Sequence, residues 1–285
     1  MFHIKLKFIK LILKNKLLYY PITMKIVGSF IKFLFIISLF FQGVTFAKDV
    51  KFIHITDTNV NLSNASKLLK TVKEINEYED IDFVVFGGNN ISKTNIDNLN
   101  TFLYLLKKVN KKTIVLLGSS DVYASSGIDK KYYLKRVKKA RLKRLSFHSS
   151  KTNYSFEKNG YIFVVMDGAK QYFQSSNGYY SKAELVWLDK ELNKFKDKNV
   201  IILQHFPILP TDSTWLNTAK TEDYFEILSK HKNVKVIVSG HYGKNTEVKK
   251  DGICHIITEG YNKNGAYKII HLDLDDDFIG TYLVK

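Results

Sequence analysis

The chain has 285 residues, 45% of them hydrophobic and 14% aromatic, which is enough to bury the core of one or two domains. Lysine and arginine outnumber aspartate and glutamate by 44 to 27, a formal net charge of +17. A basic surface attracts phosphate esters, nucleic acids and acidic lipids, although a general lysine bias of the sequence explains the charge equally simply. Without an RNP, zinc-finger or helix-turn-helix signature, we expect no specific nucleic-acid binding. The single cysteine, Cys254, excludes an intrachain disulfide, and its apolar neighbours predict a buried small hydrophobe.

Residues 1–47 predict a leader and signal peptide that lie outside the fold. They hold seven lysines and no acidic residue, and an apolar run over residues 33–41 precedes Thr45 and Ala47. Small residues at these two positions are typical of signal-peptidase cleavage, here after Ala47. We therefore expect export, to the periplasm or outside the cell, rather than anchoring by an uncleaved leader. Translation from Met24 would explain the long segment before it, and a membrane-surface amphipathic segment is the alternative.

Residues 48–285 are expected to form one domain that starts with alternating strands and helices. Apolar β-branched runs predict strands, and apolar residues at helical spacing predict the helices between them. The predicted strands cover residues 50–55, 81–86 and 113–117, and the predicted helices cover 64–78 and 95–109. Three such units in sequence favour an α/β fold whose first strands are parallel.

The second half predicts a hairpin, two more helices and a group of closing strands. Asn159-Gly160 is a strong two-residue turn signal, and Ser181 with Glu184 forms a capping box that opens a helix. The helices are predicted at residues 182–195 and 221–231, and the strands at 154–157, 161–166, 200–203, 234–238, 246–249, 253–258, 267–272 and 278–284. We expect the last four strands to be antiparallel.

Residues 129–145 predict a strongly basic helix with a thin apolar stripe. It could lie near the site and attract an anionic substrate or an anionic membrane surface. We favour the simpler interpretation, a solvated helix face in a lysine-rich protein.

Polar residues follow five of the predicted strands. His205 ends the apolar run Val200–Leu203 and is followed by Pro207 and Pro210, so a rigid loop leaves the strand at this histidine. Alone, it could equally be a core histidine. Open α/β sheets place their sites at the carboxyl ends of strands, which makes the whole set a candidate site: Asp57 to Asn59, Asn89, Ser119 to Asp121, His205 and His241.

The order and spacing of these residues resemble the calcineurin-like metallophosphoesterases over essentially all of residues 50–285. The resemblance includes stretches without chemistry, such as the hairpin that ends at Met166-Asp167 and the helix AELVWLDKEL. It implies a four-layer αββα sandwich in which two packed sheets are flanked by helices.

The chain departs from the family pattern, which runs D-x-H, G-D-x-x-D, G-N-H-D/E, a lone H and G-H-x-H. Asp57, Asp121, His205 and His241 match it. The replacements are Asn59 for the first histidine, Asn89 for the metal-bridging aspartate, Ser92 for the second aspartate, Ser119 for the asparagine ligand, Ser120 for the histidine taken to be the general acid, and Gly243 for the last histidine.

By this resemblance the metal-ligand positions are Asp57, Asn59, Asn89, Ser119, His205 and His241, and the catalytic positions are Ser120 and Asp121. The implied cofactor is a divalent ion (Mn, Zn or Fe). We expect one ion or none rather than two, because a neutral Asn89 cannot offset the repulsion between neighbouring cations. Asp57, His205 and His241 could hold a single ion in an open site. We favour the alternative that they are remnants paired by hydrogen bonds.

Three functions remain open. The favoured one is an exported family member with weak or no phosphoester hydrolysis that acts by binding a phosphate ester, another anionic ligand or a partner. The alternative is an active phosphomonoester or phosphodiester hydrolase with unusual ligands and a mononuclear or dinuclear metal site. In the third, the basic helix and the leader bind a membrane surface and the fold is a scaffold.

Overall fold

The computed structural model describes residues 49–141, 151–173, 175–212, 216–274 and 276–285. The leader and signal peptide expected at residues 1–47 lie outside these ranges, so cleavage after Ala47 stays a prediction. Within the described ranges, no helix is both long and apolar enough to cross a membrane.

The first sheet has a parallel core with an antiparallel hairpin at one edge. Its strand order is β11-β10-β1-β2-β3, in which β1, β2 and β3 are parallel and the β10–β11 hairpin joins β1 in the antiparallel direction. The parallel start predicted from the sequence is therefore present. The strands are Val50–Ile55 (β1), Phe83–Phe86 (β2), Lys112–Val115 (β3), Tyr267–Asp273 (β10) and Phe278–Val284 (β11).

The second sheet has the order β4-β5-β6-β7-β9-β8, with four parallel strands between antiparallel edges. The prediction that the last four strands are antiparallel was only partly right, because β9 also pairs in parallel with β7. The mostly buried β9 suits an interior position, whereas the mostly exposed β8 suits an edge. Cys254 on β9 is half-buried rather than fully buried. The strands are Tyr154–Lys158 (β4), Tyr161–Met166 (β5), Val200–Gln204 (β6), Val234–Ser239 (β7), Thr246–Lys250 (β8) and Ile253–Ile257 (β9).

The helices begin and end close to the positions that the sequence predicts. The capping box is present, since Ser181 Oγ accepts from Glu184 N at 3.3 Å and the Glu184 carboxylate accepts from Ser181 N at 2.7 Å. The basic helix starts at Lys130 and is described as far as Arg141. The helices are Ala65–Glu77 (α3), Ile96–Lys108 (α4), Lys130–Arg141 (α5), Lys182–Lys194 (α6), Glu222–Lys230 (α7) and Tyr261–Asn264 (α8), with a 3₁₀ turn at Ala124–Ser126.

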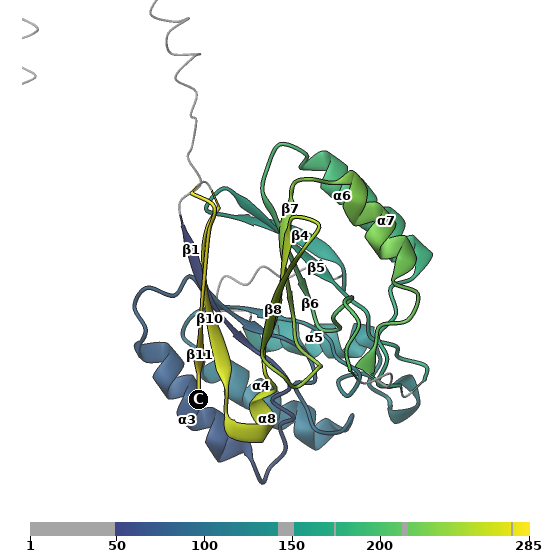
Figure 1. The fold of residues 1–285 in the computed structure, drawn as a ribbon. Coiled ribbons are helices and arrows are strands. Elements are labelled where there is room, and N and C mark those ends of the chain that lie inside the picture. The colour runs from purple at the N-terminus through teal and green to yellow at the C-terminus, as the bar shows by residue number, and fades with distance from the viewer. Residues whose placement is uncertain (1–48, 142–150, 174, 213–215, 275) are drawn as a thin grey trace, which may run out of the picture. The chain divides into compact units, whose positions relative to one another are not determined.

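The two sheets pack face to face, with α3, α4 and α5 on the outer face of the first sheet and α6 and α7 on that of the second (Figure 1). Alternation along the strands produces these layers. On β1, for example, Phe52 faces the other sheet while Ile53 and Ile55 face the helices. Phe52 also stacks on Phe83 with ring centroids 4.9 Å apart, a contact worth about 0.5–1.5 kcal/mol beyond burial. The predicted αββα sandwich is confirmed.

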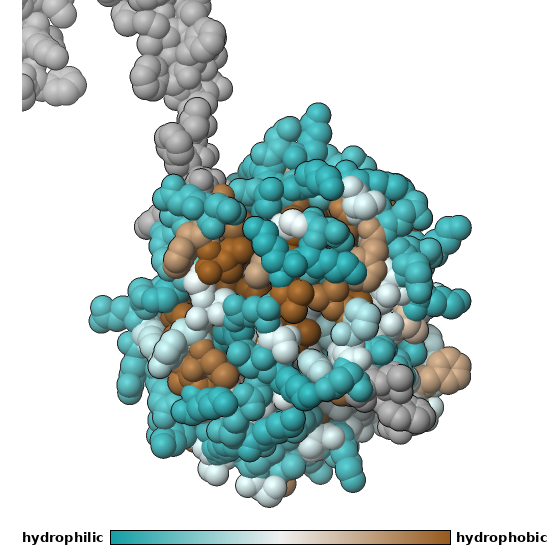
Figure 2. Space-filling model, in the orientation of Figure 1, coloured by the Kyte–Doolittle hydropathy of each residue, from teal (hydrophilic) through white to brown (hydrophobic). Residues whose placement is uncertain are grey.

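The face formed by β8, β10 and β11 is not uniformly polar. Figure 2 shows apolar residues grouped near the middle of this face, within a rim of hydrophilic ones. Val248 on β8 and Phe278 on β11 are each 47% exposed. Both strands are sheet edges, and the lysines of β8, Lys249 and Lys250, protect that edge against pairing with another chain.

Candidate functional site

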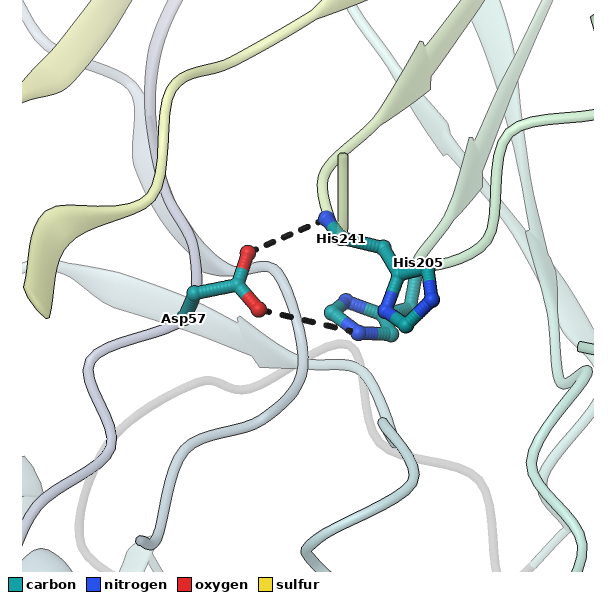
Figure 3. Close-up of side chains that lie close together, drawn as sticks. All are labelled: Asp57, His205 and His241. Atoms are coloured by element: carbon teal, nitrogen blue, oxygen red, sulfur yellow. Dashed lines mark hydrogen bonds and ion pairs between the residues drawn. The ribbon is translucent and has the colours of Figure 1, made fainter. Parts of the chain in front are cut away.

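Three of the predicted residues meet where the carboxyl ends of the two sheets come together. Asp57 follows β1, His205 follows β6 and His241 follows β7. Each offers a ligand atom, and these atoms lie within 4.8 Å of one another (Figure 3). All three residues are buried, so the ligand atoms are already assembled within the fold; this cluster is called the pocket below.

Hydrogen bonds from three directions fix the Asp57 carboxylate. Oδ2 accepts from the backbone N–H of His241 and from the Thr56 hydroxyl, both at 3.0 Å. Oδ1 accepts from Nδ2 of Asn89 at 3.0 Å. Burial nevertheless raises the pKa of Asp57 above its usual range, against the opposing effects of His241 and these hydrogen bonds. A positive charge close to the carboxylate would stabilise its ionised form.

His205 is oriented as histidine ligands of metals usually are. Its Nδ1 lies 2.6 Å from the carbonyl oxygen of Gly87, which fixes the proton on this nitrogen. Nε2 then carries the lone pair; it is buried, has no hydrogen-bond partner among the described residues, and lies 3.9 Å from Oδ1 of Asp57. Burial lowers the pKa of His205 to about 4, so the imidazole is neutral at physiological pH.

His241 presents a second neutral imidazole to the same pocket. Burial, reinforced by His205, lowers the pKa of His241 to about 3. Within the described part of the chain, neither ring nitrogen has a partner in hydrogen-bonding geometry, although the backbone of Ser176 lies close enough to favour the protonated form. The two imidazole rings lie 5.0 Å apart, and Phe206 packs edge-on against both.

The backbone at the strand ends takes an uncommon conformation. The φ angles are 54° at Asp57, 44° at Asn59, 51° at Asn89 and 66° at His241. This left-handed region costs a non-glycine residue of order 1–3 kcal/mol and is concentrated at functional sites. Asn59 and Asn89, which differ from the family pattern, thus share this backbone conformation with Asp57 and His241, which match it.

Gly88 allows the strand end to approach His205. Its φ is 95°, and a Cβ at this position would lie 2.6 Å from Cγ of His205. Only glycine meets both demands, so the loop of the second motif packs directly on the imidazole.

Asn89 connects the pocket with the serines of the third motif. While its nitrogen donates to Asp57, its oxygen Oδ1 accepts from the backbone N–H of Ser120 at 3.0 Å and lies 3.1 Å from the Ser120 hydroxyl oxygen. The Ser119 hydroxyl lies 3.3 Å from the same oxygen. The replaced residues thus satisfy one another through neutral hydrogen bonds.

The two predicted catalytic positions have other partners. The Ser120 hydroxyl lies 2.6 Å from the carbonyl oxygen of Ile91. The Asp121 carboxylate is fully buried and accepts from the backbone N–H groups of Gly118 and Asn90, both at 2.8 Å, and of Ile91 at 3.2 Å. Burial raises the pKa of Asp121 to about 7 although these donors oppose it. Asp121 thus ties the second and third motifs together beneath the pocket.

Of the three missing histidines, those at positions 59 and 243 differ in what surrounds them. Asn59 joins the site through its backbone, whose N–H donates to the carbonyl of Asn89 at 2.9 Å. Among the described residues, no hydrogen bond links the Asn59 side chain to another member of the site. At Gly243, the ammonium of Lys263 donates to the carbonyl oxygen at 2.9 Å, and a Cβ on Gly243 would lie 3.0 Å from it. A lysine cation therefore lies beside the position of the last histidine.

The sequence did not single out four residues that shape this site. Thr56 and Asn90 adjoin Asp57 and Asn89, and Phe206 follows His205, so each stands next to a motif residue that was identified. Lys263, on the short helix α8, carried no signal, because only folding brings this segment to Asp57, whose carbonyl accepts from Asn262 N at 3.0 Å.

The chemistry of these three residues fits a divalent ion. Two neutral imidazoles and one carboxylate are a suitable ligand set for a transition metal. The unpartnered, buried Nε2 of His205 is an orphan that a metal would satisfy. By contrast, the side of Asp57 that faces Asn89 is occupied by an N–H donor, which cannot bind a cation.

Comparisons of the sequence with known proteins indicate its family. The family model for calcineurin-like phosphoesterases matches residues 50–244. A probable cyclic nucleotide phosphodiesterase of Vesicomyosocius okutanii subsp. Calyptogena okutanii (strain HA) is 24% identical over 208 residues, which cover 70% of this chain and 79% of the relative. The 3',5'-cyclic adenosine monophosphate phosphodiesterase CpdA of Haemophilus influenzae is 22% identical over 205 residues, covering 67% of this chain and 69% of the relative.

Solved structures share the fold. A dimetal phosphatase from Danio rerio aligns with a TM-score of 0.60 and 15% identity, covering 82% of this chain and 98% of that one. GAP50, described as the anchor in the inner membrane complex of Plasmodium, aligns with a TM-score of 0.56 and 16% identity, covering 83% and 84%. At these identities the likeness concerns the fold alone. Together with the family model, which spans most of the chain, it confirms the resemblance carried by the motifs: the chain belongs to the calcineurin-like phosphoesterase family.

Proposed function

We propose that this protein binds a phosphate ester at the Asp57, His205 and His241 pocket, holds one divalent ion there, and hydrolyses the ester weakly or not at all. The observation that carries the proposal is the hydrogen bond of 3.0 Å from Asn89 Nδ2 to Asp57 Oδ1. It puts a neutral donor where the family pattern has a bridging carboxylate, and without that charge two neighbouring cations repel each other.

Asp57 and the two histidines would hold the ion. When bound, a divalent ion polarises a phosphoryl oxygen as a Lewis acid. The chain itself supplies neutral imidazoles, since burial lowers the pKa of His205 to about 4 and that of His241 to about 3. Neither ring has to lose a proton before it can act as a ligand near neutral pH.

Weak hydrolysis follows from the surroundings of Ser120. A general acid needs a pKa near the working pH, and a serine hydroxyl lies far above that. Here the hydroxyl also lies 2.6 Å from the Ile91 carbonyl oxygen, so its proton is directed away from the pocket. A leaving group would depart without proton transfer from this position.

An anionic ligand is supported by the lysine at the last motif. The Lys263 ammonium, which donates to the Gly243 carbonyl, brings a positive charge to a position where the family has a metal-ligating histidine. Two of the relatives carry the name cyclic nucleotide phosphodiesterase, so we propose a cyclic nucleotide as the phosphate ester. We also propose that the mature protein is exported.

The second candidate is a working single-metal phosphodiesterase. It is favoured by the ligand set of Asp57, His205 and His241, because catalytic zinc sites combine three protein ligands with a further position for water or substrate.

Metal analysis combined with hydrolysis separates the two. Protein purified with Mn²⁺ or Zn²⁺ supplied is analysed for bound metal, and then tested on 3',5'-cyclic AMP and on bis-p-nitrophenyl phosphate. The proposal expects up to one metal equivalent, turnover far below roughly 1 per second, and a rise in melting temperature when cyclic AMP is added with Mn²⁺. The Asp57→Asn/His205→Ala variant should lose both metal and ligand effects. Ordinary turnover that this variant abolishes would establish the second candidate instead, and two metal equivalents would contradict the single-ion proposal.

A further inference from the structure

A cavity of about 610 Å³ lies between α4 and α5, two neighbouring helices on the outer face of the first sheet (Figure 1). Ligand pockets for small molecules typically have about 300–1,000 Å³. None of the residues that line the cavity belongs to the Asp57 site, so the proposed function does not account for it.

The lining of this cavity is positively charged. Lys107 from α4 and Lys135, Arg136 and Lys139 from α5 contribute to it, and none of the described lining residues is acidic. In the part of the chain that the structure describes, no ion pair involves any of these three lysines. The cations are thus left uncompensated by the fold, which favours an anionic ligand.

Arg136 is held ready for such a ligand. Its Nη1 donates to the Tyr132 hydroxyl at 2.7 Å and its Nη2 to Oδ1 of Asn100 at 2.5 Å. Both acceptors are neutral, so they orient the guanidinium without cancelling its charge. A planar guanidinium with further free donors suits a phosphate group, which it can bind with two parallel hydrogen bonds.

The cavity also contains exposed aromatic surface. Tyr104 is 54% exposed. Tyr104 and Tyr132 each contribute an aromatic ring to the lining. An exposed aromatic ring beside cations is suited to stacking with a flat heterocycle. A bilayer would need a flat or convex basic face, whereas this site is concave.

We propose that the cavity between α4 and α5 is a second binding site, which takes a nucleoside monophosphate. The phosphate binds at Arg136, with Lys135 and Lys139 beside it, and the base lies against Tyr104. The site goes beyond the proposed function, because it uses neither the metal ligands nor the strand ends.

The test is calorimetric titration of the full chain with AMP, in chelator and at 150 mM salt, which screens exposed charges beyond about 8 Å. The cavity variant is Lys135→Gln/Arg136→Gln/Lys139→Gln. A matched control, Lys182→Gln/Lys190→Gln/Lys196→Gln, removes the same charge from residues on and beside α6, far from the cavity lining. We expect the Kd for AMP to rise at least tenfold in the cavity variant and to stay unchanged in the control. Tyr104→Leu should raise it at least threefold, and adenosine without phosphate should bind more weakly than AMP.

Several results would overturn the inference. The first two are that the parent chain does not bind AMP, or that the cavity variant binds it as tightly as the parent. The third is that the control variant loses as much affinity as the cavity variant, which would show that the overall positive charge attracts AMP. Binding of anionic vesicles or single-stranded DNA that the cavity variant loses, without AMP binding, would assign the cavity to a macromolecule. If the cavity variant does not fold, the exposed Tyr104→Leu change and single Lys139→Gln carry the test. In Asp57→Asn/His205→Ala, AMP binding should persist; its loss would place AMP at the strand ends and leave the proposed function standing.

Discussion

The Nδ2 atom of Asn89 lies 3.0 Å from Oδ1 of Asp57, so the carboxylate of the first motif is bound to an amide of the second. This contact puts a neutral donor on the carboxylate where the family pattern has a second carboxylate. It stabilises the pocket, because it satisfies a buried carboxylate that would otherwise lose a hydrogen bond.

Asn89→Asp should reverse that balance. The new carboxylate would face Asp57 with the same charge, and we expect the free energy of unfolding in chelator to fall by about 1–3 kcal/mol. Metal binding should more than restore it, because a ligand that binds only the folded state stabilises that state. Thermal melts in chelator and in Mn²⁺ measure both effects. The control is Asn193→Asp, at an exposed position on α6. If Mn²⁺ leaves the melting temperature of Asn89→Asp unchanged, the site assignment is wrong.

Gly88→Ala should damage the pocket through geometry alone. The φ of 95° at Gly88 and the 2.6 Å approach to Cγ of His205 both oppose a Cβ there. Gly127 is a matched control, since its φ is 80° and a Cβ added to it would meet no neighbouring atom within 4 Å. We expect Gly127→Ala to lose about 1–2 kcal/mol of stability from backbone strain, and Gly88→Ala to lose clearly more and to lose its Mn²⁺-dependent rise in melting temperature. Equal losses in urea unfolding would argue against close packing at His205.

The stability of the fold should depend on His54 below neutral pH. Burial lowers the pKa of His54 to about 3, whereas an unfolded histidine has a pKa of about 6.5. The unfolded chain therefore binds the proton more tightly, so the contribution of His54 is fully present above pH 6.5 and is lost as the pH falls towards the folded value. This loss amounts to about 2 kcal/mol between pH 7.5 and pH 5.

Other groups also titrate in this range. Asp121 acts in the opposite direction, because burial raises its pKa to about 7. The free energy of unfolding in urea is therefore measured for the parent and for His54→Gln at several pH values. Titrating groups that both proteins share contribute equally and cancel in the difference. The parent should lose more stability than the variant on acidification; parallel curves would mean that His54 is not protected from protonation.

Export predicts a specific mature end. If the signal peptide is cleaved after Ala47, mass spectrometry of protein recovered from the periplasm or the medium should find Lys48 at the N-terminus. Ala47→Phe should slow processing, because the peptidase needs a small residue there. Soluble cytoplasmic protein with an intact leader would refute the expectation.

The sequence predicted the layers because burial leaves a simple periodic pattern. The strands through Val200–Leu203 and Val234–Val238 are continuous or nearly continuous apolar runs, and the structure buries both within the second sheet. The sequence did not predict which sheet each of the last strands joins, because β9 and β10 are both largely buried but belong to different sheets. Which sheet a hairpin joins depends on long-range packing, which local patterns do not encode.

For the site, the sequence identified the residues but not their partners. The convergence of Asp57, His205 and His241 followed from their places at strand ends. The hydrogen bonds of Asn89 to Asp57, Ser119 and Ser120 did not, because they depend on side-chain orientation. Lys263 could not be identified at all, since nothing near it in sequence resembles a motif. The roles of Ser120 and Asp121 stay predictions.

The left-handed backbone at Asp57, Asn59, Asn89 and His241 has a consequence for the history and reuse of this fold. The backbone turns set the direction of the side chains, whereas the side chains themselves supply the ligand atoms, so the two can change independently. In the genetic code, asparagine is a single-nucleotide change from both aspartate and histidine. A lineage, or a designer, could therefore exchange ligands at Asn59 and Asn89 stepwise while the chain path stays as it is.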